Sequence, residues 1–331
     1  MSTWMIILTI FLSFALTAVI GHFVLKWLIS KGAGQMIREE GPQSHQSKAG
    51  TPTMGGIMII LGVIITCLIM RRGLHADMAV LLISFLLFAL IGFCDDFVKV
   101  MKSRNLGLTA KQKFLFQLVI AIILAIYQAK MSEYGTSIYI PIAKTYFDLG
   151  WFYYPFVVFV LVAMVNAVNL TDGMDGLAAG CTVFVALFLM IQSLTFGNDD
   201  TTVFCAALTG GCMGFLLYNR FPAKVFMGDT GSLALGGALA AAAVMMHIEM
   251  ILVIAGAVFV AECLSVIIQV AYFRKSGGKR ILKMSPLHHH FQDNGVNHES
   301  LIPGFKWKET SIVLMFWGIT CGLCLISMFL L

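Results

Sequence analysis

The stretch MAVLLISFLLFALIGFCDDF, from Met78 to Phe97, decides the fold, because it joins a long apolar run to two adjacent carboxylates. About 20 apolar residues in helical form are needed to cross the hydrocarbon core of a bilayer. A helix satisfies its own backbone hydrogen bonds inside lipid, and this run is too long for a strand of a membrane barrel. The stretch therefore predicts a transmembrane helix whose last turn carries Asp95 and Asp96 at the membrane surface.

The rest of the chain has the same apolar character. Of its 331 residues, 59% are hydrophobic and 12% are charged, which excludes a water-soluble globular protein of this length. We expect an all-α integral membrane protein, a polytopic bundle of about ten transmembrane helices, in a single domain that covers residues 1–331. The expected spans are residues 4–28, 53–70, 78–97, 114–130, 153–171, 176–196, 201–219, 231–247, 250–273 and 309–330.

The positions of the basic residues predict how the bundle is oriented. Lys and Arg favour the cytoplasmic side of membrane proteins, and 17 of the 22 fall in the odd-numbered connections between the expected spans. We therefore expect those connections in the cytoplasm and both termini outside. Residues 231–247 are rich in Gly and Ala, which lets neighbouring helices approach closely and predicts a place at the bundle centre. Residues 132–151 predict a short external hairpin.

Carboxylate and carboxamide side chains gather where the expected spans meet the cytoplasm. Asp95 and Asp96 lie one helical turn before Lys99, and Asp229 precedes the eighth span. A stripe at three-residue spacing consists of Asn166, Asn169, Asp172 and Asp175. Adjacent carboxylates at a low-dielectric boundary resist joint ionisation unless a cation lies near them.

Mg²⁺ suits this arrangement, because it prefers oxygen ligands, uses few carboxylates and keeps places for phosphate oxygens. Lysines in the same connections suit phosphate capture. They are Lys48, Lys99, Lys102, Lys111 and Lys113. Acids and amines in one plane of the membrane predict metal-assisted phosphate chemistry at the cytoplasmic face.

Structural alternatives stand beside these interpretations. The acidic pair also suits a solvated helix end with its lysine as counter-charge, and the last two members of the stripe suit the first turn of the next helix. Lys102, Arg104, Lys113 and residues 274–280 are interpreted mainly as orientation signals and contacts to anionic lipids. Glu262, alone in the ninth span, is open between a packing group and a functional carboxylate.

Three successive histidines occupy residues 288–290. They do not share a helical face, and no Cys or His elsewhere has a spacing typical of zinc, so the pattern disfavours a zinc site. Imidazoles in a loop over a phosphate site donate hydrogen bonds to a diphosphate or relay protons near neutral pH. We interpret the three histidines in this way.

Five ordered motifs resemble the phospho-N-acetylmuramoyl-pentapeptide transferase family, a branch of the polyprenyl-phosphate sugar-1-phosphate transferases. They are Lys48-Ala-Gly-Thr-Pro-Thr-Met-Gly-Gly56, Asp95-Asp96-x-x-Lys99, Asn166-Ala-Val-Asn169-Leu-Thr-Asp172-Gly-Met-Asp175-Gly, Phe226-Met-Gly-Asp229-Thr-Gly-Ser232 and Pro286-Leu-His-His-His290. Each motif is weak alone, but their order on one expected face, over most of the chain, is specific. The histidine run favours this family over the alternative, the GlcNAc-1-phosphate transferases of the same superfamily.

The resemblance implies a bacterial inner-membrane enzyme of ten helices, usually homodimeric, that requires Mg²⁺. It implies transfer of phospho-MurNAc-pentapeptide from UDP-MurNAc-pentapeptide to undecaprenyl phosphate, which gives lipid I and UMP in peptidoglycan synthesis. Membrane lipids are expected partners, and nucleic acid is not.

The resemblance also implies roles for individual residues. The implied metal ligands are Asn169 and Asp229. The implied catalytic group is Asp95, Asp96, Lys99, Asp229 and His289, with Asp95 as the candidate for activating the lipid phosphate. The implied substrate-binding residues are Lys48, Thr53, Lys111, Asn169, Asp172, Asp175, Asn219, Phe226, Gln269, His288, His289 and His290, among which Phe226 stacks on uracil.

The expected reaction brings two anions together, so a cation and lysines must screen their repulsion. Positioning and charge stabilisation suffice in other phosphoryl transfers, which favours direct displacement over a covalent aspartyl phosphate. A secondary transporter would place ionisable groups near mid-bilayer and show internal repeats. An intramembrane aspartyl protease would need two facing Asp within spans, and the residues before Asp229 lack the G-x-G-D form of that class.

Overall fold

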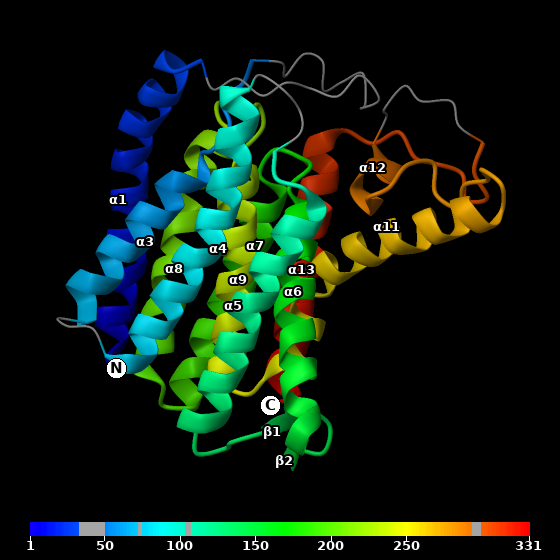
Figure 1. Cartoon of the computed structure of the whole chain (residues 1–331). Helices are drawn as coiled ribbons and strands as arrows, with labels where there is room; N and C mark the ends of the chain where they lie inside the picture. Colours follow the sequence, from blue (N-terminus) through cyan, green and yellow to red (C-terminus); the bar gives the residue numbers. More distant parts are fainter. Residues whose placement is uncertain (33–49, 72–74, 103–106, 293–298) are drawn as a thin grey trace.

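The computed structural model describes residues 1–32, 50–71, 75–102, 107–292 and 299–331. Its helices are α1 (Thr3–Ser30), α3 (Gly56–Arg71), α4 (Ala76–Met101), α5 (Ala110–Met131), η1 (Gly150–Phe152), α6 (Tyr153–Thr171), α7 (Leu177–Thr195), α8 (Asp199–Asn219), α9 (Gly228–Met245), α10 (Glu249–Ala255), α11 (Ala257–Lys275), α12 (Leu287–Phe291) and α13 (Glu309–Phe329). Within these ranges nine helices are long and apolar enough to cross a membrane, and α3 is a shorter apolar helix. The predicted all-α polytopic membrane bundle is confirmed (Figure 1).

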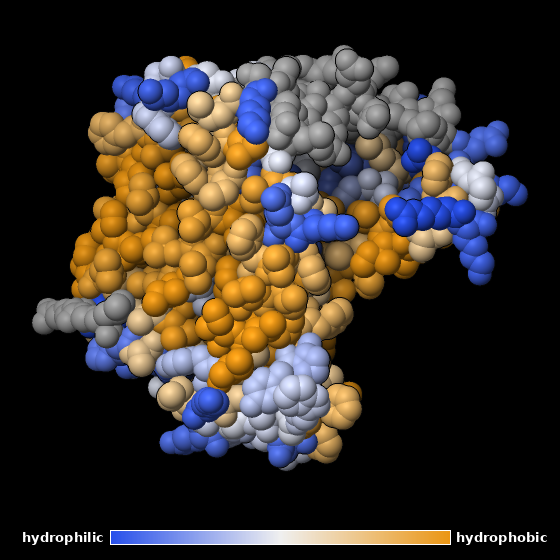
Figure 2. Space-filling view, in the orientation of Figure 1, coloured by the Kyte–Doolittle hydropathy of each residue, from blue (hydrophilic) through white to orange (hydrophobic). Residues whose placement is uncertain are grey.

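The surface of the bundle is divided as a bilayer requires. Figure 2 shows apolar side chains across the middle of the visible face, with hydrophilic residues gathered at its two ends. Both termini lie at the same end of the bundle (Figure 1). The prediction that they share one side of the membrane agrees with this arrangement.

α9 lies at the centre of the bundle, as its small residues predicted. In its apolar window 89% of the residues are buried, compared with 28% in α1 at the periphery. The helices α3, α4 and α6 all contact it. Its Gly and Ala side chains leave room for these neighbours, so the helix ends that carry the acidic motifs meet around its first turn.

The connection between α5 and α6 forms the predicted hairpin. Strands β1 (Ser137–Ile140) and β2 (Thr145–Asp148) pair antiparallel, and Ser137 faces Asp148. The hairpin is tied to the bundle because the backbone N–H of Tyr139 donates to the carbonyl of His247, at 2.9 Å. It lies at the end of the bundle that holds the termini (Figure 1).

The span expected over residues 250–273 is wrong as one continuous helix, although Ala257–Lys275 within it is long and apolar enough to cross a membrane. The chain breaks at Gly256, which ends the short helix α10 and caps the start of α11. α11 leaves the bundle at an oblique angle, and only 28% of its apolar window is buried (Figure 1). Hydropathy stays high across Gly256, so an apolar run alone could not reveal this change of direction. The break carries the histidine segment to the same end of the bundle as the acidic motifs.

Candidate active site

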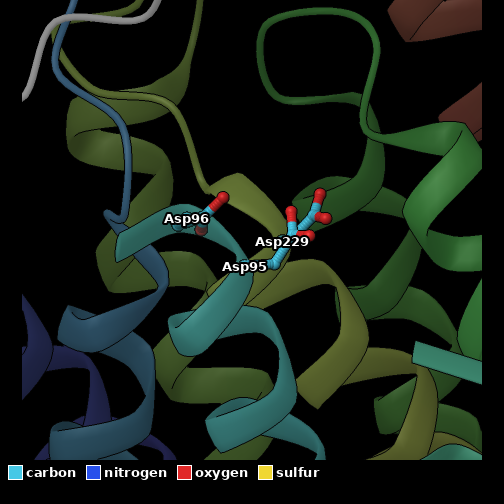
Figure 3. A group of neighbouring side chains, drawn as sticks. All are labelled: Asp95, Asp96 and Asp229. Atoms are coloured by element: carbon cyan, nitrogen blue, oxygen red, sulfur yellow. The ribbon is translucent and has the colours of Figure 1, made fainter. Parts of the chain in front are cut away.

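α4 ends and α9 begins at the end of the bundle opposite the termini (Figure 1). Gly92 lies where the two helices touch, since a Cβ built on it would lie 2.0 Å from the carbonyl oxygen of Asp229. Only glycine permits so close an approach. The contact places Asp95 and Asp96, on the next turn of α4, beside Asp229 in the first turn of α9 (Figure 3). A carboxylate in that turn is stabilised by the positive end of the helix dipole.

Asp95, Asp96 and Asp229 form a carboxylate cluster, with one oxygen of each within 4.8 Å of the others. The Lys99 ammonium lies 2.5 Å from Asp95, 3.7 Å from Asp96 and 3.3 Å from Asp229. Lys113 lies 3.0 Å from Asp229 and 3.5 Å from Asp95. Three carboxylates against two ammonium groups leave a formal charge of −1. Because Asp95 and Asp96 are 0% and 3% exposed, the alternative of a solvated helix end is wrong.

The three carboxylates are held in different ways. Asp96 accepts hydrogen bonds from the backbone N–H and the hydroxyl of Thr230, at 2.9 and 2.7 Å. Asp95 accepts from the backbone N–H of Leu108, at 2.8 Å. The Asp229 side chain is 17% exposed, the largest value of the three. Asp96 thus commits one oxygen to the start of α9 and turns the other toward Lys99, whereas Asp229 and Asp95 each contact both lysines.

α6 adds an amide to the cluster. Asn169 Nδ2 donates to Asp229 at 3.0 Å and to the Ser232 hydroxyl at 2.8 Å. The helix ends at Thr171, so the predicted helical stripe through Asp172 and Asp175 is wrong beyond that residue. Asp172 has a non-helical backbone and caps α6. Both acids therefore lie in the connection that precedes α7.

Asp172 is a half-buried carboxyl next to the cluster. Burial raises its pKa to about 8, and the negative charges of Asp229 and Asp96 act in the same direction. At neutral pH this carboxyl carries a proton unless a cation approaches it. A divalent ion at the cluster would favour its charged form.

Residues 52–56 run beside the connection that leads into α9. The backbone N–H of Phe226 donates to the Pro52 carbonyl, and the N–H of Gly55 donates to the Phe226 carbonyl, each at 2.8 Å. Thr53 is buried and Phe226 is half-buried in this pairing, two predicted substrate-binding residues that thus lie near Asp229. Lys48, a third, lies outside the described residues.

Two protein-family models match the parts of the chain that carry the site. Residues 78–247 match Glycosyl transferase family 4, and residues 48–60 match the Phospho-N-acetylmuramoyl-pentapeptide-transferase signature 1. The Phospho-N-acetylmuramoyl-pentapeptide-transferase of Thermoanaerobacter sp. is 48% identical over 326 residues, 98% of this chain and 97% of that protein. That of Heliobacterium modesticaldum is 48% identical over 316 residues, 96% and 93% of the two chains. That of Listeria innocua is 43% identical over 322 residues, 96% of each.

The chain belongs to the phospho-N-acetylmuramoyl-pentapeptide transferase family. The family matches include all members of the carboxylate cluster and Asn169, because these residues lie within 78–247. They also include Thr53. The resemblance drawn from the five motifs is therefore confirmed.

In this transferase two predicted substrate residues hold the connection after α6. Asn219 accepts from the backbone N–H of Gly176 and donates to the Val225 carbonyl, each at 3.0 Å. Asp175 accepts from the backbone N–H of Ala223, at 2.9 Å. These bonds give both side chains a structural role, and their contacts with substrate stay predictions.

The three histidines lie in α12 and are buried. His290 Nδ1 accepts from the backbone N–H of Lys283, at 3.1 Å. Burial lowers the pKa of His290, and the charge of Lys283 lowers it further. His289 Nδ1 lies 3.1 Å from Gln292 Oε1. Gln269 binds the backbone of the segment that follows α11, since its Oε1 accepts from the N–H groups of residues 281 and 282.

Lys113 is the functional candidate that the sequence interpretation undervalued. The sequence pattern favours orientation and lipid contact for Lys113, yet its ammonium group reaches Asp229 and Asp95. Lys111, which was predicted to bind substrate, is exposed and has no contact with the cluster among the described residues. The sequence carries part of this information. Thr109 and Gln112 form a capping box that starts α5, so Lys111 and Lys113 both lie in its first turn. Residues two positions apart in a helix point in different directions, so only one of the two lysines can face the cluster.

Proposed function

We propose that this transferase moves phospho-MurNAc-pentapeptide from UDP-MurNAc-pentapeptide to undecaprenyl phosphate, releasing UMP and forming lipid I. The observation that carries the proposal is the carboxylate cluster with Lys99 and Lys113 at one end of a membrane bundle. A site at the membrane edge suits a reaction between a water-soluble nucleotide and a lipid phosphate. Relatives 43% to 48% identical over nearly the whole chain bear the name of this transferase.

The carboxylate cluster fits Mg²⁺. Its donor atoms are carboxylate oxygens within 4.8 Å of one another, which is the donor type that this hard cation prefers. Asp229, Asp95 and Asp96 would hold the ion. Asn169 donates its amide N–H to Asp229, and its side-chain oxygen would be a further ligand if the amide were rotated. A bound Mg²⁺ supplies charge neutralisation at the diphosphate and at the departing UMP.

The reaction is a direct displacement. An oxygen of the lipid phosphate attacks the β-phosphorus of the donor, and a new P–O bond forms. The bond from that phosphorus to the oxygen bridging the two phosphates breaks, and UMP leaves with the electron pair. Lys99 and Lys113 screen the repulsion between the anions. Asp95 orients the lipid phosphate, and it has little proton to remove because a phosphate monoester is already mostly ionised at neutral pH.

The site faces the cytoplasm of a bacterium, at the inner membrane. This orientation is supported by the 17 of 22 basic residues that fall in the odd-numbered connections between the spans expected from the sequence. A homodimer is part of the proposal, on the resemblance to the family, and chemical cross-linking in membranes tests it.

The experiment measures UMP release by the purified full-length chain in detergent with UDP-MurNAc-pentapeptide. Release is expected only when undecaprenyl phosphate and Mg²⁺ are both added, and it is expected to be far weaker with UDP-GlcNAc. Asp229→Ala removes the most accessible carboxylate of the cluster and should abolish release even at high Mg²⁺. Glu133→Ala, an exposed acid at the other end of the bundle, is the matched control and should leave it unchanged. Release without the lipid, or full activity of Asp229→Ala, overturns the proposal.

A further inference from the structure

Glu262 and His288 form a buried pair beside the proposed site. Glu262 lies in α11 and His288 in α12, and both side chains are 0% exposed. The carboxylate accepts twice from His288: the backbone N–H lies 3.1 and 3.3 Å from its two oxygens, and Nδ1 lies 3.0 Å from Oε2. A buried carboxylate is costly unless such donors satisfy it.

This geometry determines where the imidazole proton sits. A carboxylate only accepts hydrogen bonds, so Nδ1 must carry the hydrogen that faces Glu262. In the neutral ring Nε2 is then a bare acceptor. His288 Nε2 is buried and has no hydrogen-bond partner among the described residues. An unsatisfied buried acceptor of this kind calls for a functional explanation.

The bare nitrogen faces the connection that carries Asp172. A Cβ built on Gly173 would lie 2.3 Å from His288 Nε2, so the imidazole rests directly on the backbone next to Asp172. The pair thereby joins three elements, α11, α12 and the end of α6. Glu262 lies in the first turns of α11, whose helix contacts α6 and α13, so the pair sits where α11 and α12 meet the bundle.

We propose that Glu262 is a positioning residue, which fixes the tautomer of His288 and so sets the histidine segment against the turn that borders the nucleotide-sugar diphosphate. The inference rests on the proposed function, because the turn that carries Asp172 borders the site only if the diphosphate binds there. The carboxylate acts through His288 and does not touch substrate. Replacement of residues that orient metal-ligating side chains typically costs about 10- to 100-fold in activity, and we expect an effect at the lower end of that range here.

Glu262→Gln separates positioning from packing. Glutamine has the same size, but its side chain offers one accepting oxygen to two donors of His288. Where the new NH₂ group faces Nδ1, it donates to that nitrogen, so the imidazole proton moves to Nε2 and the bare acceptor becomes a donor. A packing role predicts no such change, since the volume of the side chain is unaltered.

The first measurement is the tautomer. Histidine labelled with ¹⁵N in the full-length protein should show His288, assigned by loss of its signals in His288→Ala, with the proton on Nδ1. In Glu262→Gln the proton should appear on Nε2. A wild-type proton on Nε2 overturns the proposal, and this outcome does not depend on which reaction the protein catalyses.

The second measurement is UMP release by Glu262→Gln, His288→Ala and the double variant. Glu262→Gln should lower kcat by roughly 10-fold, with a smaller change in the KM for undecaprenyl phosphate. In the His288→Ala background it should cause no further loss, because the carboxylate would have nothing left to position. Glu249→Gln, a buried glutamate at the opposite end of the bundle, is the control and should keep wild-type activity. Additive losses, or full activity of Glu262→Gln, overturn the inference, whereas absence of UMP release in the wild type refutes the proposed function instead.

Discussion

Asp199 and Asp200, at one end of the bundle, are neutralised in a different way from the carboxylate cluster at the other end. At the end that holds the termini, Asp200 pairs with Arg71, and Asp199 accepts from the N-terminal ammonium of Met1 at 3.1 Å. At the opposite end, three carboxylates share two lysines, and their oxygens lie within 4.8 Å of one another. Acids matched with their own cations hold the fold together. Acids that outnumber their cations keep charge and oxygen atoms available for a ligand.

Removal of Mg²⁺ should have the largest effect on activity, and its effect should depend on the acids at one end of the bundle only. Chelation should reduce UMP release on the order of 1000-fold, since the ion contributes several kcal/mol to stabilising the reacting charges. Added Mg²⁺ should also raise the thermal unfolding temperature, because a ligand at about 100 times its Kd stabilises by about 2.7 kcal/mol. Asp229→Ala should lose this thermal shift, and Asp199→Ala should keep it. A shift that survives in Asp229→Ala would place the ion elsewhere.

The contrast between the ends explains what the sequence could predict. Apolar runs and the position of each acid within its own helix were readable, so the bundle and the pairing of Asp95 and Asp96 with Lys99 were correctly predicted. The approach of Asp229 depends on a glycine contact between helices distant in the sequence. The order of the expected spans placed Asp229 on the same face as Asp95, but it did not predict their contact.

Two predictions failed where backbone direction changes inside a uniform pattern. Hydropathy is continuous across Gly256, and three-residue spacing continues past Thr171, but helices end at both places. Hydropathy and spacing describe which side chains a helix would present, and neither reports where the helix stops. The role of Glu262 stayed open for a related reason, because its partner His288 is reached only after α11 turns away.

Lys113→Ala should produce the next largest effect. Loss of an ammonium group 3.0 Å from Asp229 should lower kcat/KM about 100-fold, by analogy with removal of one charge-stabilising donor from an active site. Lys111→Ala is the matched control. Its exposed side chain should cost less than about fivefold, as is typical of surface charges. Equal losses in the two variants would show that the contacts with the cluster do not decide which lysine matters.

Asp172→Asn should change how stability depends on pH. The folded-state pKa of Asp172 is raised from an ordinary 3.8 to about 8, so the folded protein binds more protons than the unfolded chain between these values. Stability therefore falls as pH rises through this window. The variant lacks the titrating group, so its unfolding temperature should decline less than that of the wild type between about pH 5 and about pH 8. Identical slopes in thermal unfolding would contradict the raised pKa.

Asp200→Asn should have the smallest effect on activity, and it tests whether the acids near the termini serve stability alone. The substitution leaves Arg71 with a neutral partner in a largely buried contact, where the two side chains are 22% and 11% exposed. We expect a loss of about 1–3 kcal/mol in stability, seen as a lower unfolding temperature in detergent. UMP release below that temperature should stay near wild type, because this pair lies at the opposite end of the bundle from the cluster. If activity fell as steeply as in Lys113→Ala, the two ends would be energetically coupled, and the acids near the termini would have to be counted among the groups that shape the site.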